Sequence, residues 1–220
     1  LRPGVGIVVS PLIALMEDQV AALKLQGIKA AYYNSSLNNT EARQVLTALH
    51  QQALDLLYIA PERLLSESFL ARLDDCPIAL FAIDEAHCVS QWGHDFREEY
   101  SQLKILKSLR PDVPILALTA SATPQVLSDI SFNLNLKKPE RMVHGFYRPN
   151  LYYQVETCSD DEEKLRILIH ALEQTPEGRV IIYCGTRKVT ETLSETLREH
   201  FESEVGYYHA GLSPQNRRSE

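Results

Sequence analysis

Two adjacent carboxylates, Asp84 and Glu85, directly follow an uninterrupted apolar run at residues 78–83. Such a run is typical of a parallel strand buried on both faces, and the residues after it reach the sheet edge where α/β folds bind ligands. Two neighbouring carboxylates are costly to bury there unless a cation or a reaction uses them. Mg²⁺ holds nucleotides through one or two carboxylates and phosphate oxygens, which suits Asp84. Glu85 would then orient or deprotonate the water that attacks the phosphate.

The segment after these carboxylates combines polar, aromatic and cationic side chains at His87, Gln91, Trp92, His94, Phe96 and Arg97. Aromatic rings beside a cation suit single-stranded nucleic acid, because every base offers a face for stacking. Two alternatives stay open at this point. The carboxylates could form a solvated turn, and Trp92 and Phe96, four positions apart, could pack as one buried helix face. A zinc site at His87, Cys88 and His94 lacks a fourth ligand at usable spacing.

The elements that must position these residues follow from an alternation of apolar runs and amphipathic stretches. Strands are expected at residues 6–10, 28–33, 56–60, 78–83 and 115–118. The rhythm restarts with strands at residues 151–155, 180–184 and 205–208, and with helices over residues 162–172 and 188–200. Thr123 and Pro124 form a suitable N-cap and first residue for a further helix. This alternation predicts an α/β fold whose parallel sheets are covered by helices on both faces.

A looser segment at residues 137–150, with two prolines and a glycine, interrupts the alternation. We therefore expect a first domain over residues 1–146, a junction at residues 147–150 and part of a second domain over residues 151–220. The last residues, around Pro214–Arg217, look like the first turn of another helix.

The composition excludes several classes of protein. With 45% hydrophobic and 23% charged residues, the 220-residue chain is globular rather than disordered or fibrous. Its net charge of −7 argues against a broad basic surface for nucleic acid, although a local positive groove is compatible with it. The four cysteines are scattered and fit neither a disulfide framework nor a zinc ribbon. No apolar run is long enough for a membrane span, and the opening residues do not show the pattern expected of a signal peptide.

Taken together, these strings resemble the RecQ family of superfamily-two DNA helicases. The DEAH box at residues 84–87 and the SQWGHDFR loop at residues 90–97 are similar to its most specific signature. Further helicase motifs are matched in order at residues 8–19, 58–64, 118–123, 146–150, 182–187 and 208–212. Tyr147 stands where aspartate is usual in the bacterial members. Each string is weak alone, but their order makes the resemblance specific along the whole chain.

The resemblance implies an ATP-dependent 3′ to 5′ DNA helicase of DNA repair and recombination, with RecA-like domains. It implies ATP and Mg²⁺ as cofactors, single-stranded DNA and duplex junctions as partners, and a place at the bacterial nucleoid in the cytoplasm. Its catalytic residues would be Asp84, which holds Mg²⁺, Glu85 and His87. Its residues coupling DNA binding to hydrolysis would be Gln91, Trp92, His94, Phe96, Arg97, Ser121 and Thr123. Its DNA-binding residues would be Ser10, Pro11, Pro61, Glu62, Arg63, Thr186 and Arg187.

A phosphate-cradling GxxxxGK[ST] loop is missing from the sequence, because none of the nine glycines is followed by lysine. In the family this loop lies upstream of the first strand seen here. We therefore expect the chain to be an internal piece of a helicase, inactive by itself, with any zinc site outside it. Two alternatives remain: another superfamily-two ATPase, such as an RNA helicase or a translocase, or a non-catalytic nucleic-acid-binding module that kept the fold.

Overall fold

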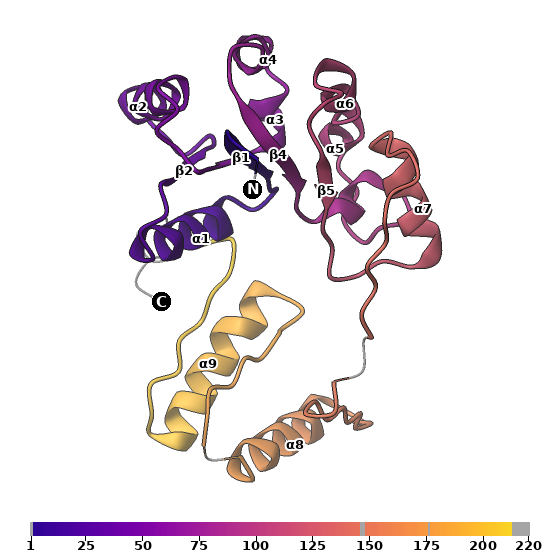
Figure 1. Cartoon of the computed structure of the whole chain (residues 1–220). Helices are drawn as coiled ribbons and strands as arrows, with labels where there is room; N and C mark the ends of the chain where they lie inside the picture. The colour runs from indigo at the N-terminus through magenta and orange to yellow at the C-terminus, as the bar shows by residue number, and fades with distance from the viewer. Residues whose placement is uncertain (1, 146–147, 176, 213–220) are drawn as a thin grey trace. The chain divides into compact units, whose positions relative to one another are not determined.

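The computed structural model describes residues 2–145, 148–175 and 177–212. The chain divides into two compact units, Leu1–His144 and Gly145–Glu220, which are called unit 1 and unit 2 below (Figure 1). Part of the expected junction, Phe146 and Tyr147, and the expected helix start at residues 214–217 lie outside the described residues.

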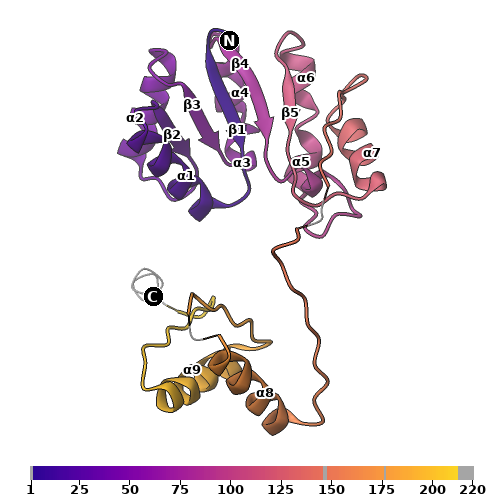
Figure 2. The same ribbon diagram turned by 60° about the horizontal axis from the view of Figure 1, so that its bottom comes forward.

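A five-stranded parallel sheet with the strand order β2-β3-β1-β4-β5 forms the centre of unit 1. The strands are β1 (Val5–Val9), β2 (Ala30–Tyr33), β3 (Leu56–Ile59), β4 (Ile78–Ile83) and β5 (Ile115–Ala117), and Figure 2 shows them side by side. The register pairs Val9 with both Ile59 and Ile83, so neighbouring strands end in line. The predicted α/β fold with a parallel sheet is confirmed, and all five strands expected in unit 1 are present.

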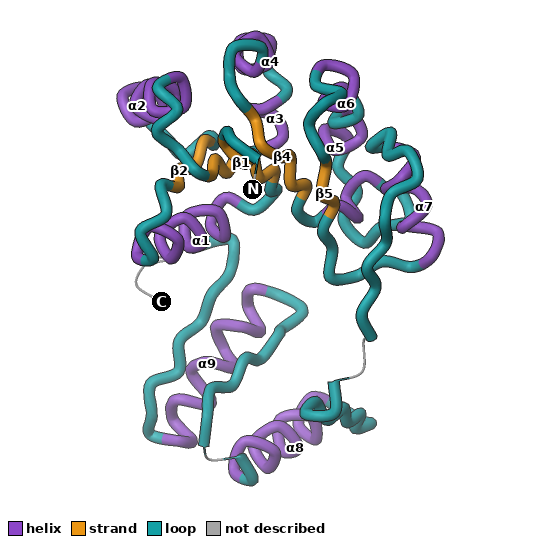
Figure 3. Tube along the Cα trace, viewed as in Figure 1, coloured by secondary structure: helices purple, strands orange, loops and turns teal. Residues whose placement is uncertain are grey.

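Helices cover both faces of this sheet (Figure 3). The helical elements of unit 1 are α1 (Ile13–Leu25), α2 (Asn39–His50), α3 (Pro61–Leu64), α4 (Glu67–Leu73), η1 (Ala86–Val89), α5 (Glu98–Gln102), α6 (Ile105–Leu109) and α7 (Pro124–Asn133). From β1 the chain passes to β2 at one edge of the sheet. It then crosses the sheet in the opposite direction, through β3 and β4 to β5 at the other edge. Right-handed crossovers therefore place α1 on the face opposite α2 and α4.

Local sequence signals start two of the helices. Asn38 caps α2 through its side chain and forms a reciprocal capping box with Glu41. The Thr123 hydroxyl accepts from the Val126 N–H, and Pro124 is the first residue of α7, as the sequence predicted. The short helices α3 to α6 were not predicted, because four to seven residues are too few to show helical periodicity.

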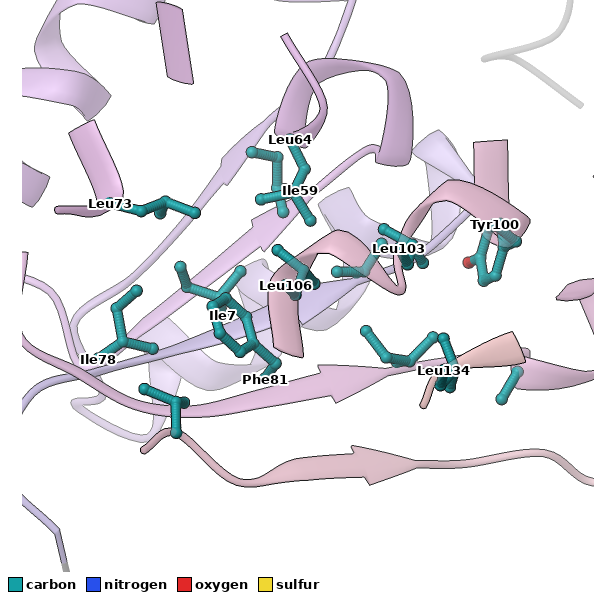
Figure 4. Packing of buried hydrophobic residues seen from close by; sticks show 14 of the residues in the cluster. Ile7, Ile59, Leu64, Leu73, Ile78, Phe81, Tyr100, Leu103, Leu106 and Leu134 are labelled. Carbon is teal, nitrogen blue, oxygen red and sulfur yellow. The ribbon is translucent and has the colours of Figure 1, made fainter. Parts of the chain in front are cut away.

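The core of unit 1 lies between the sheet and the helices that follow β3 and β4 (Figure 4). Ile7 and Phe81 project from the central strands and are completely buried. Leu64, Leu103 and Leu106 close over them from α3, from the residue after α5 and from α6. This packing determines where the carboxyl ends of β1 and β4 lie, and hence where the residues after them lie.

Unit 2 contains α8 (Asp161–Glu173) and α9 (Arg187–Phe201), which match the two helices predicted there. The prediction of strands at residues 151–155, 180–184 and 205–208 is wrong for the structure, since none of these described residues is in a strand. Val155, Ile181 and Tyr183 are 92%, 77% and 93% exposed. An apolar run becomes a strand only when a neighbouring strand pairs with its backbone, and periodicity alone does not supply that partner.

Within the described ranges, no helix combines the length and the apolar character that a membrane crossing requires. Cys76, Cys88, Cys158 and Cys184 are all free.

Candidate functional site

The carboxyl edge of the sheet gathers the predicted site residues of unit 1. Ser10 and Pro11 follow β1, Pro61 follows β3, and the carboxylate pair follows β4. The segment 118–123 follows β5 and leads into α7. Because parallel strands in register end along one line, these four separate stretches of sequence meet at this edge.

Asp84 and Glu85 are held by the backbone around them. The Asp84 N–H donates to Val9 O at 2.9 Å, and the Tyr100 hydroxyl donates to Asp84 O at 3.0 Å. The Glu85 N–H donates to Asp84 Oδ1 at 3.0 Å. Glu85 adopts the left-handed conformation, with φ 47° and ψ 43°, which costs a residue other than glycine about 1–3 kcal/mol. Backbone strain of this kind is concentrated at functional sites.

His87 joins the carboxylates to the segment after β5. Its side chain is nearly fully buried, and its Nδ1 lies 3.2 Å from Glu85 Oε2 and 2.9 Å from Thr119 Oγ1. The Thr119 hydroxyl donates its own proton to Ser121 O at 3.2 Å, so it can accept one from His87. A neutral ring protonated at Nδ1 satisfies this arrangement and also donates towards Glu85.

The imidazole of His87 stacks on that of His94, with ring centroids 4.0 Å apart. Burial, followed by the neighbouring His94, lowers the pKa of His87, while Glu85, Asp95 and Asp84 act in the opposite direction. The lowered pKa keeps the ring neutral at neutral pH. His94 Nδ1 lies 3.4 Å from Ser121 Oγ, so both histidines contact the segment after β5.

The lowered pKa of His87 makes the stability of unit 1 depend on pH. As the pH falls below about 6.5, the unfolded chain takes up a proton that the folded protein resists, so stability is lost with falling pH. We expect urea unfolding, followed by Trp92 fluorescence, to show a larger loss of stability between pH 7.5 and pH 5.5 for the unchanged chain than for His87→Gln. An equal loss in both proteins would contradict the assignment.

The loop at residues 91–97 presents its aromatic rings to solvent. Trp92 is 73% exposed and Phe96 43% exposed, and neither lies in a helix, so the alternative of a buried helix face is wrong. A Cβ on Gly93 would lie 2.4 Å from His87 O, so only glycine lets the loop fold this closely onto η1. Gln91 is also exposed.

Arg97, the last residue of this loop, is held by several hydrogen bonds. Its Nε and Nη2 donate to Asp95 Oδ2 at 3.0 and 2.8 Å, and its Nη1 donates to Pro11 O at 3.5 Å. The Arg97 N–H donates to Cys88 O at 3.0 Å. The loop therefore begins and ends on η1 and contacts the turn after β1.

The predicted DNA-binding residues of unit 1 differ in exposure. Ser10 is fully buried, and among the described residues its hydroxyl has no hydrogen-bond partner. Pro61 is buried as the first residue of α3, whereas Glu62 is exposed. The Arg63 guanidinium lies over the Tyr33 ring, 5.4 Å from its centroid. The side-chain groups best placed to meet a ligand are therefore those of Glu62 and Arg63.

The remaining two predicted residues, Thr186 and Arg187, lie in unit 2. The Thr186 hydroxyl caps α9 by accepting from the Val189 N–H, and Arg187 is the first residue of that helix. A Cβ on Gly211 would lie 3.0 Å from Arg187 Nη1. Glycine therefore lets residues 209–212 approach this guanidinium.

Asp84 is the residue at this edge that the sequence predicts as a Mg²⁺ ligand. Among the described residues, no group of three or more histidines, cysteines and carboxylates is arranged to hold a metal ion. Asp84 offers one carboxylate at the carboxyl end of β4. One carboxylate suits a Mg²⁺ ion that takes its other ligands from phosphate oxygens and water.

Four side chains at the site were missed by sequence reasoning: Thr119, Tyr100, Ser90 and Asp129. Thr119 and Ser90 lie inside matched motifs, so their positions carried a signal but their partners did not. Tyr100 and Asp129 contact residues 16 and 39 positions away, which no local pattern reveals.

Comparison with known proteins gives consistent matches. A DEAD/DEAH box helicase family model matches residues 2–130. The chain is 44% identical over 215 residues to the ATP-dependent DNA helicase RecQ of Pasteurella multocida, covering 97% of the chain and 33% of that protein. It is 42% identical over 215 residues to the probable ATP-dependent DNA helicase RecS of Bacillus subtilis, covering 97% and 43%.

A solved structure shares the fold. The Mycobacterium smegmatis helicase Lhr, bound to ssDNA and AMP-PNP, matches with a TM-score of 0.60 at 16% identity, over 99% of this chain and 32% of that one. The chain thus spans a third to less than half of the length of these proteins.

Proposed function

Because this chain belongs to the DEAD/DEAH box helicase family, we propose that it is the part of an ATP-dependent DNA helicase that joins ATP hydrolysis to DNA binding. The resemblance to RecQ proteins, which the motifs indicated, is confirmed by identities of 42–44% over 97% of the chain. The activity, polarity and substrates of the whole protein are part of the proposal.

One observation carries this proposal: a short chain of contacts links the carboxylates to an exposed aromatic loop. Glu85 meets His87, His87 stacks on His94, and His94 belongs to the loop that exposes Trp92. A solvated acidic turn would need neither a buried neutral histidine nor a left-handed glutamate. A change in the loop can therefore reach Glu85 through two imidazoles.

At the nucleotide side, Asp84 is the residue that would hold Mg²⁺, and Glu85 is the base that would orient and deprotonate the attacking water. Bound Mg²⁺ would neutralise charge on the phosphates. Tyr100 and Val9 keep the Asp84 backbone in place through the hydrogen bonds described above. His87, neutral and buried, holds the Glu85 carboxylate towards the segment after β5.

At the DNA side, the exposed rings of Trp92 and Phe96 would stack on bases, and Arg63 would meet the phosphate backbone. Gln91, His94, Arg97, Ser121 and Thr123 would transmit the loop's position to the catalytic pair. Pro11 and Pro61 shape the neighbouring turns, and Thr186 and Arg187 would contribute contacts from the second domain. We further propose that residues 1–146 form the first helicase domain and residues 151–220 part of the second, and that the bacterial protein works at the nucleoid.

The test compares the complete gene product with the chain described here. We expect the complete protein to hydrolyse ATP faster with single-stranded DNA and to unwind a DNA duplex with a 3′ tail. The 220-residue chain should hydrolyse ATP only at background, because its sequence lacks the phosphate-cradling loop. Such loops and arginine fingers supply most of the charge stabilisation, and the finger alone is worth about 10³–10⁵ in rate.

Each alternative predicts a different result. Unwinding of RNA but not DNA duplexes would make the protein an RNA helicase. Stimulation by DNA without unwinding would indicate a translocase. A complete protein that binds DNA but never hydrolyses ATP would be a non-catalytic module and would overturn the proposal. Turnover by the 220-residue chain itself would imply a phosphate site that the motifs do not reveal.

A further inference from the structure

A buried hydroxyl holds the start of the aromatic loop. Ser90 has no exposed surface, and its Oγ donates to Asp129 Oδ2 on α7 at 2.5 Å. The same Oγ accepts from the backbone N–H of Trp92 at 3.1 Å. A serine hydroxyl has one proton to donate, so the Asp129 carboxylate determines where that proton points and leaves a lone pair free for Trp92. Because Ser90 itself is fully buried, its hydroxyl has these two partners in place of solvent.

A second contact ties the same place to the same helix. Asn133 Nδ2, at the end of α7, donates to Val89 O at 3.5 Å. The backbone of Ser90 is engaged as well, since its N–H donates to His87 O and its carbonyl accepts from the Gly93 N–H, both at 3.0 Å. The base of the loop is therefore well ordered, although the Trp92 ring above it is largely exposed.

The helix that carries Asp129 also continues directly from the segment that contacts the two histidines. Thr119 and Ser121 lie just before α7 and meet His87 and His94. Aspartate is a poor helix former, so its place inside α7 has a cost that the bond to Ser90 can offset. A single continuous stretch, residues 119–133, thus holds both the histidine pair and the start of the loop.

We propose that Asp129 is a positioning residue for DNA-stimulated ATP hydrolysis, acting through the Ser90 hydroxyl on the backbone of Trp92. The inference rests on the function proposed above for the loop. When the backbone of Trp92 is held, the exposed indole ring occupies one position before DNA binds. DNA binding then loses less conformational entropy in ordering the loop. More of the binding free energy is therefore available to shift the loop between its arrangements. Without the Asp129 carboxylate, the Trp92 ring is still present, but the backbone that carries it is no longer restrained.

The first test needs no activity. In the 15N-labelled 220-residue chain, the Trp92 amide that donates to Ser90 can be followed directly, and its indole gives the single tryptophan side-chain signal. We expect Asp129→Ala to lower the order parameter of this amide from about 0.85 to below about 0.6, the values of rigid and flexible backbone. Ser90→Ala should do the same, and the double variant should add little.

Two further variants isolate the hydrogen bond. Asp129→Asn keeps an acceptor oxygen at the same place and should retain most of the order of the Trp92 amide. Ser128→Ala is the matched control, because it removes an exposed hydroxyl on α7 whose only described bond is to Pro124 O. If Asp129→Ala does not fold, Ser90→Ala gives the same measurement. An unchanged Trp92 amide in Ser90→Ala, or equal loosening by Asp129→Asn and Asp129→Ala, would overturn the proposal.

The second test uses the complete protein. Asp129→Ala should reduce DNA stimulation of ATP hydrolysis about tenfold and leave the DNA-free rate unchanged. A tenfold change corresponds to the free energy that one charge-assisted hydrogen bond typically contributes. Asp129→Asn should restore most of the stimulation. A wild-type protein that DNA does not stimulate would refute the proposed function but not the role of Asp129 in the loop. A stimulated wild type with an equally stimulated Asp129→Ala would refute the inference alone.

Discussion

Replacing Glu85 by glutamine in the complete protein should lower DNA-stimulated ATP hydrolysis by about 10²–10⁴-fold, the usual contribution of a positioned general base. The amide keeps the size of the side chain but cannot accept the proton of the attacking water. Glu85 is suited to that role because its left-handed backbone and its contact with His87 orient a side chain that is 32% exposed. Steady-state ATPase assays with saturating single-stranded DNA give the measurement.

Nucleotide binding separates this role from a structural one. Glu85→Gln should bind a fluorescent ATP analogue about as well as the unchanged protein, because Asp84 is left in place. Glu98→Gln, an exposed carboxylate at the start of α5, is the matched control and should keep full activity. Retention of most of the ATPase rate by Glu85→Gln would show that another group activates the water.

Replacing Trp92 by alanine should remove most of the DNA stimulation and the unwinding, with little change in the DNA-free ATPase rate. Stacking of one base on an aromatic ring is worth about 1–3 kcal/mol, which is enough to shift a loop between two arrangements of similar energy. Phe96→Ala should act in the same direction but less strongly, because Phe96 is only 43% exposed.

Stability measurements on the same variants complete this test. Since Trp92 is 73% exposed, Trp92→Ala should change the unfolding free energy by only about 0.5 kcal/mol. Phe81→Ala, which removes a completely buried ring, should cost about 3–5 kcal/mol. Phe132→Ala, an 84% exposed ring on α7, is the control for exposed aromatics and should leave DNA stimulation unchanged. Stimulation that survives Trp92→Ala would contradict the proposed role of the loop.

Much of unit 1 could be predicted because its signals are local. Apolar runs marked all five strands of the parallel sheet, and the run at residues 78–83 placed the carboxylates at a strand end, where β4 in fact delivers them. Thr123 and Pro124 identified the start of α7 through short-range hydrogen bonding and a restricted dihedral angle. These features depend on residues a few positions apart, so the amino-acid sequence alone determined them.

Only the tertiary structure decided which surfaces these elements bury. Trp92 and Phe96 had the spacing of a helix face, yet Gly93 folds their loop tightly onto η1 and leaves both rings exposed. The runs at residues 180–184 and 205–208 had the composition of strands, but none of these described residues is in a strand. His87 with Thr119 and Ser90 with Asp129 meet across 32 and 39 positions. The physical reason is the same in each case. Burial of a side chain and pairing of a strand both require a second segment of the chain, and the local sequence of one segment does not specify which other segment packs against it.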